Sequence, residues 1–290
     1  MRWLSLIVVG FLSATSAFAQ EEKTLVMVAG HPSHGTGQHE FNAGVQLLAK
    51  CLQGVKGLKT EVHLGGWPAD KTAFDNADAI FLYMDGGDNH PAAQGDHLQK
   101  LGALMDKGVG LMCAHYAVEI GKDNGGKEFQ KWIGGYYETH FSVNPMWSPQ
   151  YKDYVKHPVL NGVQPFSVED EWYFNMRFAE TGPQIVHLLL DKPSDDVRDG
   201  PYVSPRGPYP HIEAAKGRPE TMMWAIERAD GGRGVGFTGG HNHANWGDDN
   251  NRKAVLNALL WVSKVPVPEG GVDSTVTAEE LKANLDPKEK

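Results

Sequence analysis

Short apolar runs alternate with segments of helical periodicity along most of the chain. Such runs predict buried strands, because a strand covered on both faces of a sheet is apolar throughout. They lie at 24–29, 77–84, 109–113, 221–227 and 234–238, and residues 60–64 are expected to form a further short strand. Segments with one apolar face, which predict helices, lie at 40–52, 92–107 and 251–263. This order predicts an α/β fold with a doubly wound parallel sheet and right-handed crossovers.

Residues 134–219 interrupt the alternation. They are rich in Pro, Gly, Tyr and Trp and contain a strand-like piece at 185–190. We interpret them as a long, irregular and partly antiparallel insertion that roofs the sheet. The α/β domain is then expected to span 20–265, followed by a peripheral C-terminal tail, 266–290, with a helical patch near Thr277 to Ala283.

The first residues have the pattern of a secretory signal peptide. Arg2 precedes an apolar run from Leu4 to Leu12, and Ala17-Phe18-Ala19 fits the A-x-A cleavage rule. A membrane anchor is the alternative, but it needs about 20 apolar residues and this run is shorter. We therefore expect residues 1–19 to be removed and the protein to be exported, periplasmic or secreted, with no later membrane span.

The charge balance argues against a nucleic-acid partner. The chain has 27 basic and 36 acidic residues, a net charge of −9, and no basic stripe. A phosphate-binding surface needs clustered Lys and Arg. We interpret the negative charge as a contribution to solubility. The sequence does not fix an oligomeric state.

The chain has two cysteines, Cys51 and Cys113. An exported chain could pair them. The alternative is favoured by their places, since Cys51 lies on the apolar face of a predicted helix and Cys113 ends a buried strand. Both are therefore interpreted as small core hydrophobes.

Polar residues crowd the segments that directly follow the predicted strands. Open parallel sheets bind ligands just beyond the carboxyl ends of their strands. Four different strand ends deliver His34, His39, Asp85, His90, His115, His241 and His243. We therefore expect a histidine-rich site at this edge of the sheet.

The His-x-His pair formed by His241 and His243 suggests a metal site. In extended backbone the two rings lie on one side, an arrangement that zinc and related divalent ions use with a third ligand. His115 is the preferred third ligand, and His34 or Glu40 are alternatives. A site built from imidazoles without a metal stays open, because ligand spacing alone does not define a metal site.

Several motifs follow one another in a distinctive order between residues 24 and 264. They are Gly30 to Glu40, Cys113 to Ala117, Gly134 to His140, His157-Pro158, Asp170 to Tyr173, and Gly232 to His241 followed by Trp246. In the order and spacing of these motifs the chain resembles the ThuA-like family, named for trehalose utilisation. The resemblance implies a class I glutamine amidotransferase-like fold, which is flavodoxin-like in arrangement.

Amidotransferases of this fold carry a nucleophilic cysteine at a strand-to-helix elbow. Aligning that elbow with this chain places His115 there, and Cys113 falls two residues early. A thiol buried at a strand end is a poor nucleophile, because burial opposes formation of the thiolate. We therefore do not expect glutamine hydrolysis.

The resemblance implies carbohydrate metabolism, with a link to disaccharides and their 3-keto derivatives. A ketone at C3 acidifies the neighbouring C–H bonds, so a base can remove a proton and either shift the carbonyl or expel a glycosidic group. His115 and His241 are the expected acid and base, assisted by Asp170 or Glu171. Asp170 and Glu171 do not form a retaining glycosidase pair, because adjacent strand side chains point apart.

The expected contacts to a small-molecule carbohydrate come from the same loops and from aromatic residues. They are His34, His39, Glu40, Asp85, His140, Trp172 and Trp246. A lyase, isomerase or hydrolase acting on a sugar is the preferred function, and a divalent metal such as zinc is the candidate cofactor. The alternatives are a metal-dependent hydrolase of another small polar substrate and a sugar-binding protein without turnover.

Overall fold

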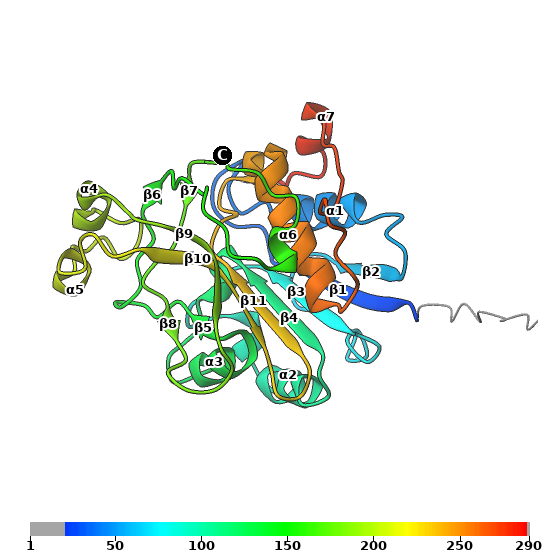
Figure 1. The fold of residues 1–290 in the computed structure, drawn as a ribbon. Coiled ribbons are helices and arrows are strands. Elements are labelled where there is room, and N and C mark those ends of the chain that lie inside the picture. Colours follow the sequence, from blue (N-terminus) through cyan, green and yellow to red (C-terminus); the bar gives the residue numbers. More distant parts are fainter. Residues whose placement is uncertain (1–20, 289–290) are drawn as a thin grey trace, which may run out of the picture.

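The computed structural model describes residues 21–288 and centres on a seven-stranded sheet (Figure 1). The predicted signal peptide lies outside the described residues. In spatial order the strands are β2 (Leu58–His63), β1 (Lys23–Ala29), β3 (Ala79–Tyr83), β4 (Gly110–Ala114), β11 (Arg233–Phe237), β10 (Glu220–Glu227) and β9 (Val186–Asp191).

The sheet is mostly parallel, which confirms the predicted α/β fold class. Strands β2, β1, β3, β4 and β11 pair in parallel, whereas β10 is antiparallel to both β11 and β9. Only residues 228–232 separate β10 from β11. A parallel crossover needs a dozen or more residues, so this short link forces a hairpin.

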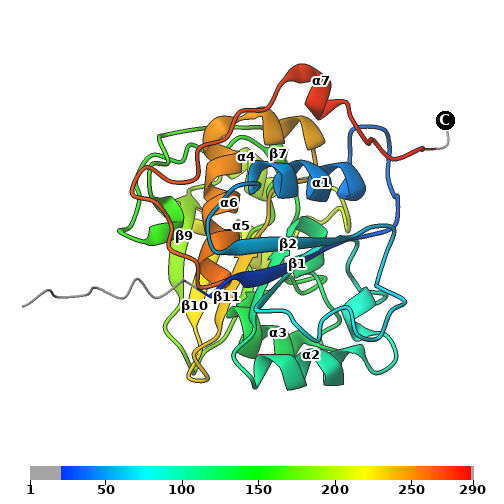
Figure 2. The same cartoon turned by 90° about the vertical axis from the view of Figure 1, so that its right-hand side faces the viewer.

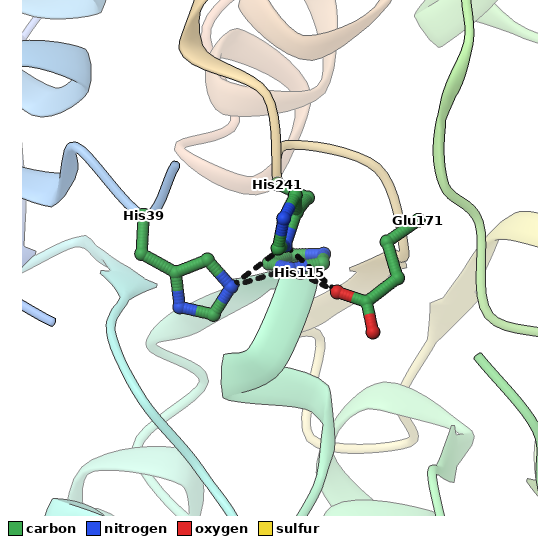
Figure 3. Close-up of side chains that lie close together, drawn as sticks. All are labelled: His39, His115, Glu171 and His241. Carbon is green, nitrogen blue, oxygen red and sulfur yellow. Dashed lines mark hydrogen bonds and ion pairs between the residues drawn. The ribbon is translucent and has the colours of Figure 1, made fainter. Parts of the chain in front are cut away.

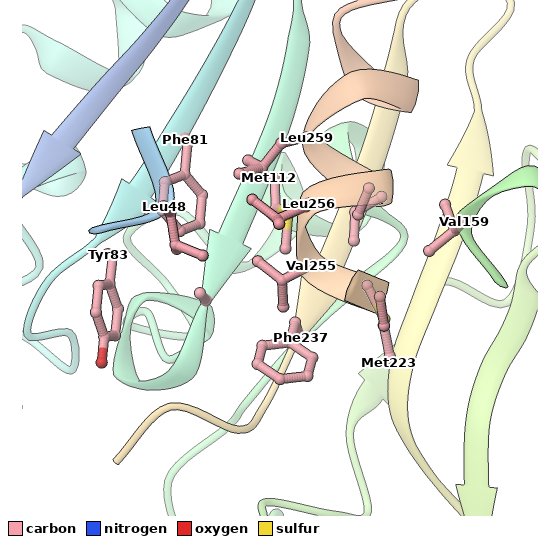
Figure 4. Packing of buried hydrophobic residues seen from close by; sticks show 14 of the residues in the cluster. Leu48, Phe81, Tyr83, Met112, Val159, Met223, Phe237, Val255, Leu256 and Leu259 are labelled. Atoms are coloured by element: carbon pink, nitrogen blue, oxygen red, sulfur yellow. The ribbon is translucent and has the colours of Figure 1, made fainter. Parts of the chain in front are cut away.

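Helices cover both faces of the sheet (Figure 2). The helices α1 (Phe41–Cys51) and α6 (Asp249–Val262) lie on one face, and α2 (His97–Met105) and α3 (Gly126–Ile133) lie on the other. Neighbouring strand residues alternate between the two cores, as Met27 and Val28 do. Figure 4 shows Leu256 and Leu259 of α6 packed over the strands of the first core.

The segment predicted as one helix over 92–107 is divided. A 3-10 turn, η1 (Pro91–Ala93), precedes α2, and Gln94 and Gly95 separate them. Gln94 is extended and Gly95 has a φ of 55°, so neither continues a right-handed helix. The remaining short elements are η2 (His115–Val118), β5 (Gly135–Tyr136), β6 (Met146–Trp147), η3 (Pro158–Leu160), β7 (Asp170–Glu171), β8 (Arg177–Phe178), α4 (Asp195–Asp199), α5 (Pro210–Glu213), η4 (His243–Gly247) and α7 (Ala278–Leu281).

The C-terminal segment returns to the loop that follows β1. The backbone N–H of Asp286 donates to the Glu40 carboxylate at 2.6 Å, and the Lys288 ammonium donates to backbone carbonyls of Ser33 and Gln38. The predicted helical patch is present as α7. Within residues 21–288 no helix is long and apolar enough to cross a bilayer, and neither cysteine there forms a disulfide.

Candidate functional site

Four buried side chains from distant segments converge beyond the carboxyl ends of the parallel strands (Figure 3). His39 comes from the loop after β1, His115 directly follows β4, and His241 lies in the loop after β11. Glu171 is the second residue of β7, which belongs to the 134–219 segment. We call these four residues the His3Glu cluster; their ligand atoms all lie within 4.8 Å of one another.

The backbone is bent sharply at two of the histidines. His39 and His115 have φ values of 46° and 53°, in the left-handed region that L residues rarely adopt. At His115 the chain passes from the extended Ala114 into η2, which is the elbow expected from the sequence. Strain of this kind gathers at functional sites, because the surrounding structure must enforce it.

The polar atoms of the cluster are in direct contact. The His39 Nε2 atom lies 3.0 Å from His241 Nδ1 and 3.0 Å from His115 Nε2. The Glu171 Oε2 atom is 2.7 Å from His241 Nδ1 and 3.5 Å from His115 Nε2. Three nitrogens and one carboxylate oxygen therefore face a common centre.

Partners outside the cluster fix the protons of two rings. The His115 Nδ1–H donates to the backbone carbonyl of Thr238 at 3.0 Å, since a carbonyl oxygen only accepts. The His39 Nδ1–H donates in the same way to the Asp85 carboxylate at 2.9 Å. The His39 Nε2 atom is therefore left with a lone pair, and it faces His115 Nε2 and His241 Nδ1.

The pKa values of three groups in the cluster differ from their ordinary values. Burial would raise the pKa of Glu171, but hydrogen bonds from His115 and His241 outweigh it and lower that pKa to about 2. Burial and the neighbouring His115 lower the pKa of His39 far below its ordinary value, so this ring is neutral. Burial also opposes protonation of His115, but the hydrogen bond to Glu171 outweighs it and raises the His115 pKa.

A pocket of about 460 Å³ opens beside the cluster. The walls come from the loops after β1, β3 and β4 and from the 134–219 segment. The lining residues are His34, His39, Gly86, Gly87, Asp88, Asn89, Tyr116, Glu119, Thr139, Asn144, Glu171, Tyr173, Val203, Ser204 and Pro205. The pocket is thus largely polar and brings His39 and Glu171 within reach of a small molecule.

Comparison with known proteins identifies the family. The family model described as "ThuA: Trehalose utilisation" matches residues 26–262. The chain belongs to the ThuA family. Membership of the ThuA family implies a role connected with carbohydrate utilisation. No curated protein sequence matches the chain.

Solved structures support the ThuA fold. A protein described as ThuA-like from Bacteroides uniformis has a TM-score of 0.56 and 16% identity, over 87% of this chain and 95% of that chain. Another protein described as ThuA-like, from Parabacteroides merdae, has a TM-score of 0.55 and 14% identity, over 89% of this chain and 94% of that chain. These likenesses concern the fold.

Two further residues predicted for the site lie next to the His3Glu cluster. The His34 ring stacks on His39 with the ring centroids 3.6 Å apart, and it lines the pocket. Asp85 accepts a hydrogen bond from His39 Nδ1, on the side of the ring away from the cluster. With His34 and His39 it forms a second group that could hold a metal. Both residues come from the strand-end loops that the sequence singles out.

Three predicted residues have bracing contacts instead of facing the pocket. Asp170 is fully buried, and its carboxylate accepts from the backbone N–H of Gly240 at 2.7 Å and of Asn242 at 3.0 Å. The Glu40 carboxylate accepts from backbone N–H groups of its own loop and of the C-terminal segment. His140 is exposed, outside the pocket lining, and contacts Tyr209.

His243 does not join the candidate metal ligands. The expected His-x-His geometry requires extended backbone, but the chain turns at Gly240 (φ 112°) and enters η4 at His243. The ring is buried away from the cluster, and neither nitrogen has a hydrogen-bond partner among the described residues. His39 and Glu171, expected only as substrate-binding and catalytic residues, complete the candidate ligand set with His115 and His241.

The two tryptophans expected to stack on a sugar lie in the core. Trp172 and Trp246 have no exposed surface, and both rings pack edge-on or tilted against Phe237. The aromatic residues that do line the pocket are Tyr116 and Tyr173, which follow predicted site residues directly in the sequence. Their position beside His115 and Trp172 is the signal that could have found them.

Cys113 has no access to the site. The thiol is fully buried in the core beneath the elbow, and burial raises its pKa far above the ordinary value. A thiolate nucleophile is strongly disfavoured there. This position agrees with the expectation that the chain does not hydrolyse glutamine.

Proposed function

We propose that this protein is a carbohydrate-processing enzyme that binds a divalent cation such as zinc at His39, His115, Glu171 and His241. Its substrate is a sugar, and a 3-keto sugar or 3-keto glycoside suits the site best. ThuA-family membership supports the substrate class. The cluster and the adjoining pocket support the chemistry.

The observation that carries the proposal is the convergence of three imidazole nitrogens and one carboxylate oxygen on a common buried centre. Two imidazole nitrogens held 3.0 Å apart repel each other unless a proton or a cation lies between them. Zinc binds nitrogen at about 2.0–2.1 Å with tetrahedral angles, so two of its nitrogen ligands lie about 3.3 Å apart. The outer bonds to Asp85 and Thr238 are the supports that metal-binding histidines usually have.

The residues divide the chemistry among them. A bound cation would polarise a ketone oxygen and stabilise the enolate that forms when a neighbouring C–H bond is broken. His115 and His241, expected from the sequence as acid and base, then serve as ligands. His34 lies outside this ligand set and lines the pocket, with its Nδ1 atom 3.0 Å from the Ser33 hydroxyl. Burial lowers its pKa, so a neutral ring there can accept the proton.

We also propose that the protein is exported through cleavage after Ala19. The charged start, the short apolar run and the A-x-A motif support this. N-terminal sequencing of protein recovered from the periplasm or the medium tests it. A chain that begins at Gln20 is expected, and an intact Met1 on cytoplasmic protein would contradict export.

Metal content tests the central proposal. We expect about one equivalent of a transition metal in the purified wild type by elemental analysis, and loss of most of it in His241→Ala. His31→Ala is the matched control, because His31 lies on the same loop as His39 but is exposed. This control should retain the metal.

Turnover of a 3-keto glycoside by the metal-loaded wild type, lost in His241→Ala, would support the enzyme. Wild-type protein that binds no metal, even when metal ions are supplied, would favour an acid–base site built from imidazoles alone. Metal without turnover of any sugar would favour a hydrolase of another small polar substrate. Sugar binding without turnover would favour a binding protein.

A further inference from the structure

We infer that the Glu119 carboxyl group is the acid that protonates the leaving oxygen when this site cleaves a glycosidic bond. The inference rests on the proposed function and adds a residue that the sequence analysis did not select. Glu119 lies four residues after His115, at the end of the turn η2 that follows β4. Its side chain lines the pocket together with Glu171 and Thr139.

Glu119 differs from the two other carboxylates of the pocket. Asp88 is exposed to solvent, and Glu171 is engaged by two histidines and by Asn144. The Glu119 side chain is only 9% exposed, and its one side-chain hydrogen bond among the described residues is from the Thr139 hydroxyl at 2.7 Å. No cation pairs with it within residues 21–288, so its charge is poorly compensated.

The surroundings of Glu119 favour the protonated form near neutrality. Burial raises its pKa to about 7, and the negative charges of Glu171 and Asp88 act in the same direction. The Thr139 hydrogen bond and the charge of His115 oppose the shift. The tyrosines around it, Tyr116, Tyr137 and Tyr173, are neutral at this pH because burial raises each of their pKa values.

The backbone holds Glu119 firmly against the pocket floor. Its carbonyl accepts from Gly87 N–H at 2.9 Å, and its N–H donates to the Tyr116 carbonyl at 3.0 Å. A Cβ atom built on Gly87, which lines the pocket, would lie 3.9 Å from the Glu119 carboxylate. The carboxylate therefore lies beside the part of the pocket wall that Gly87 forms. A buried carboxyl with a near-neutral pKa beside an ionised one is the pattern that separates acid from base in carboxylate enzymes.

The reaction balances with this assignment. The base at the rim takes the proton from C2 of a 3-keto glycoside, and the C–H electrons form the enolate. When the C3 carbonyl re-forms, a C1–C2 double bond develops and the bond from C1 to the glycosidic oxygen breaks. The leaving oxygen takes the proton of Glu119 and departs as an alcohol. Proton transfer from the base through water to the Glu119 carboxylate restores the starting state.

Leaving-group dependence tests the assignment. Methyl and 4-nitrophenyl 3-keto-glucosides are compared with metal-loaded wild type, Glu119→Gln and the exposed control Glu180→Gln. We expect Glu119→Gln to lower kcat/KM for the methyl glycoside by about 10²–10⁴-fold and for the nitrophenyl glycoside by less than about tenfold. A nitrophenolate leaves without a proton, whereas an alkoxide does not.

The pH profile gives a second readout that a structural role would not change. The rate of wild type should fall above pH 7 as Glu119 loses its proton. The Thr139 hydrogen bond lowers the Glu119 pKa, so its loss in Thr139→Val should raise that pKa and move the fall in rate to higher pH. A carbon-13 NMR titration of labelled glutamates follows the same group without substrate. Its signal near pH 7 should vanish in Glu119→Gln.

The outcomes separate the two proposals. Equal losses on both glycosides, or a near-neutral glutamate titration that persists in Glu119→Gln, would overturn the role of Glu119 and leave the proposed function intact. Wild type that processes neither glycoside would contradict the proposed function and, with it, the role of Glu119. The expected leaving-group and pH effects together would support both.

Discussion

His39 and His115 each have a hydrogen-bond partner outside the cluster, which keeps their Nε2 atoms facing each other. Each ring has a left-handed backbone and one nitrogen engaged outside the cluster, by Asp85 for His39 and by Thr238 for His115. The rings therefore cannot rotate freely away from each other. Positional restraint of this kind is what a metal site needs, because it lowers the entropic cost of gathering the ligands.

Removing the outer partner of His39 should weaken metal binding without removing a ligand. We expect Asp85→Ala to lower the affinity for zinc by about 10–100-fold, because His39 loses both its fixed tautomer and its orientation. Competition with a chromophoric chelator measures this affinity. Asp75→Asn, an exposed substitution, should leave it unchanged, and equal affinities in all three proteins would contradict the role of Asp85.

For single residues, the sequence indicates which ones lie near the site but not in which direction their side chains point. His115, His241 and Glu171 could be selected because they follow strands or lie in a motif of the family. The direction of His243 could not be predicted, because it depends on a turn at Gly240 that no periodicity reveals. Glu119 stands alone as an acid among apolar neighbours, Ala117-Val118 and Ile120, and this was the available signal.

The two side chains of the strand β7 contact different parts of the structure. Glu171 faces the cluster, whereas Asp170 faces the loop that carries His241. The alternation of side chains along a strand accounts for this division. Asp170 was expected to assist catalysis, and its carboxylate contacts the backbone of the loop after β11.

Replacing Asp170 should therefore cost stability. In Asp170→Asn an amide N–H replaces one of the carboxylate oxygens that accept from Gly240 and Asn242, so a buried donor is left without a partner. We expect the free energy of unfolding to fall by about 1–3 kcal/mol in urea titrations. The exposed control Asp153→Asn should match wild type, and so should Asp170→Asn if the loop is held by other contacts.

Most elements could be predicted because their patterns are local. The runs of β3 and β4 are apolar throughout, those of β1 and β11 are apolar after their first residues, and α1 and α6 show a clear apolar face. The antiparallel direction of β10 was not predicted, although the short 228–232 link excludes a crossover. The small strands of the 134–219 segment have only two residues each, too few for any periodicity.

At the scale of the whole molecule, polar groups are buried in the cores as well as at the site. His90 is fully buried, accepts from the Ala92 N–H and donates to the Ala117 carbonyl, which joins the loop after β3 to the turn after β4. Burial lowers its pKa to about 4. Its ring is therefore neutral in the folded protein over a pH range in which the unfolded chain binds a proton.

This difference should make His90 a source of acid sensitivity. The pKa is depressed on folding, so stability is complete above pH 6.5 and is lost as the pH falls toward 4; the loss amounts to about 3 kcal/mol. His90→Gln keeps a donor and an acceptor but does not titrate, so its urea midpoint should fall less between pH 7 and 4.5. The exposed control His31→Gln should keep the wild-type slope, and parallel slopes in all three would contradict this role.

Assembly of the His3Glu cluster brings together residues that are far apart in the sequence. His39 and His241 are 202 residues apart in sequence and meet only after the sheet is assembled. Under the proposed function, a cation that binds only the assembled form would favour folding by mass action. Under the proposed function, the metal supply of the compartment in which the chain folds therefore sets how much of the protein survives there.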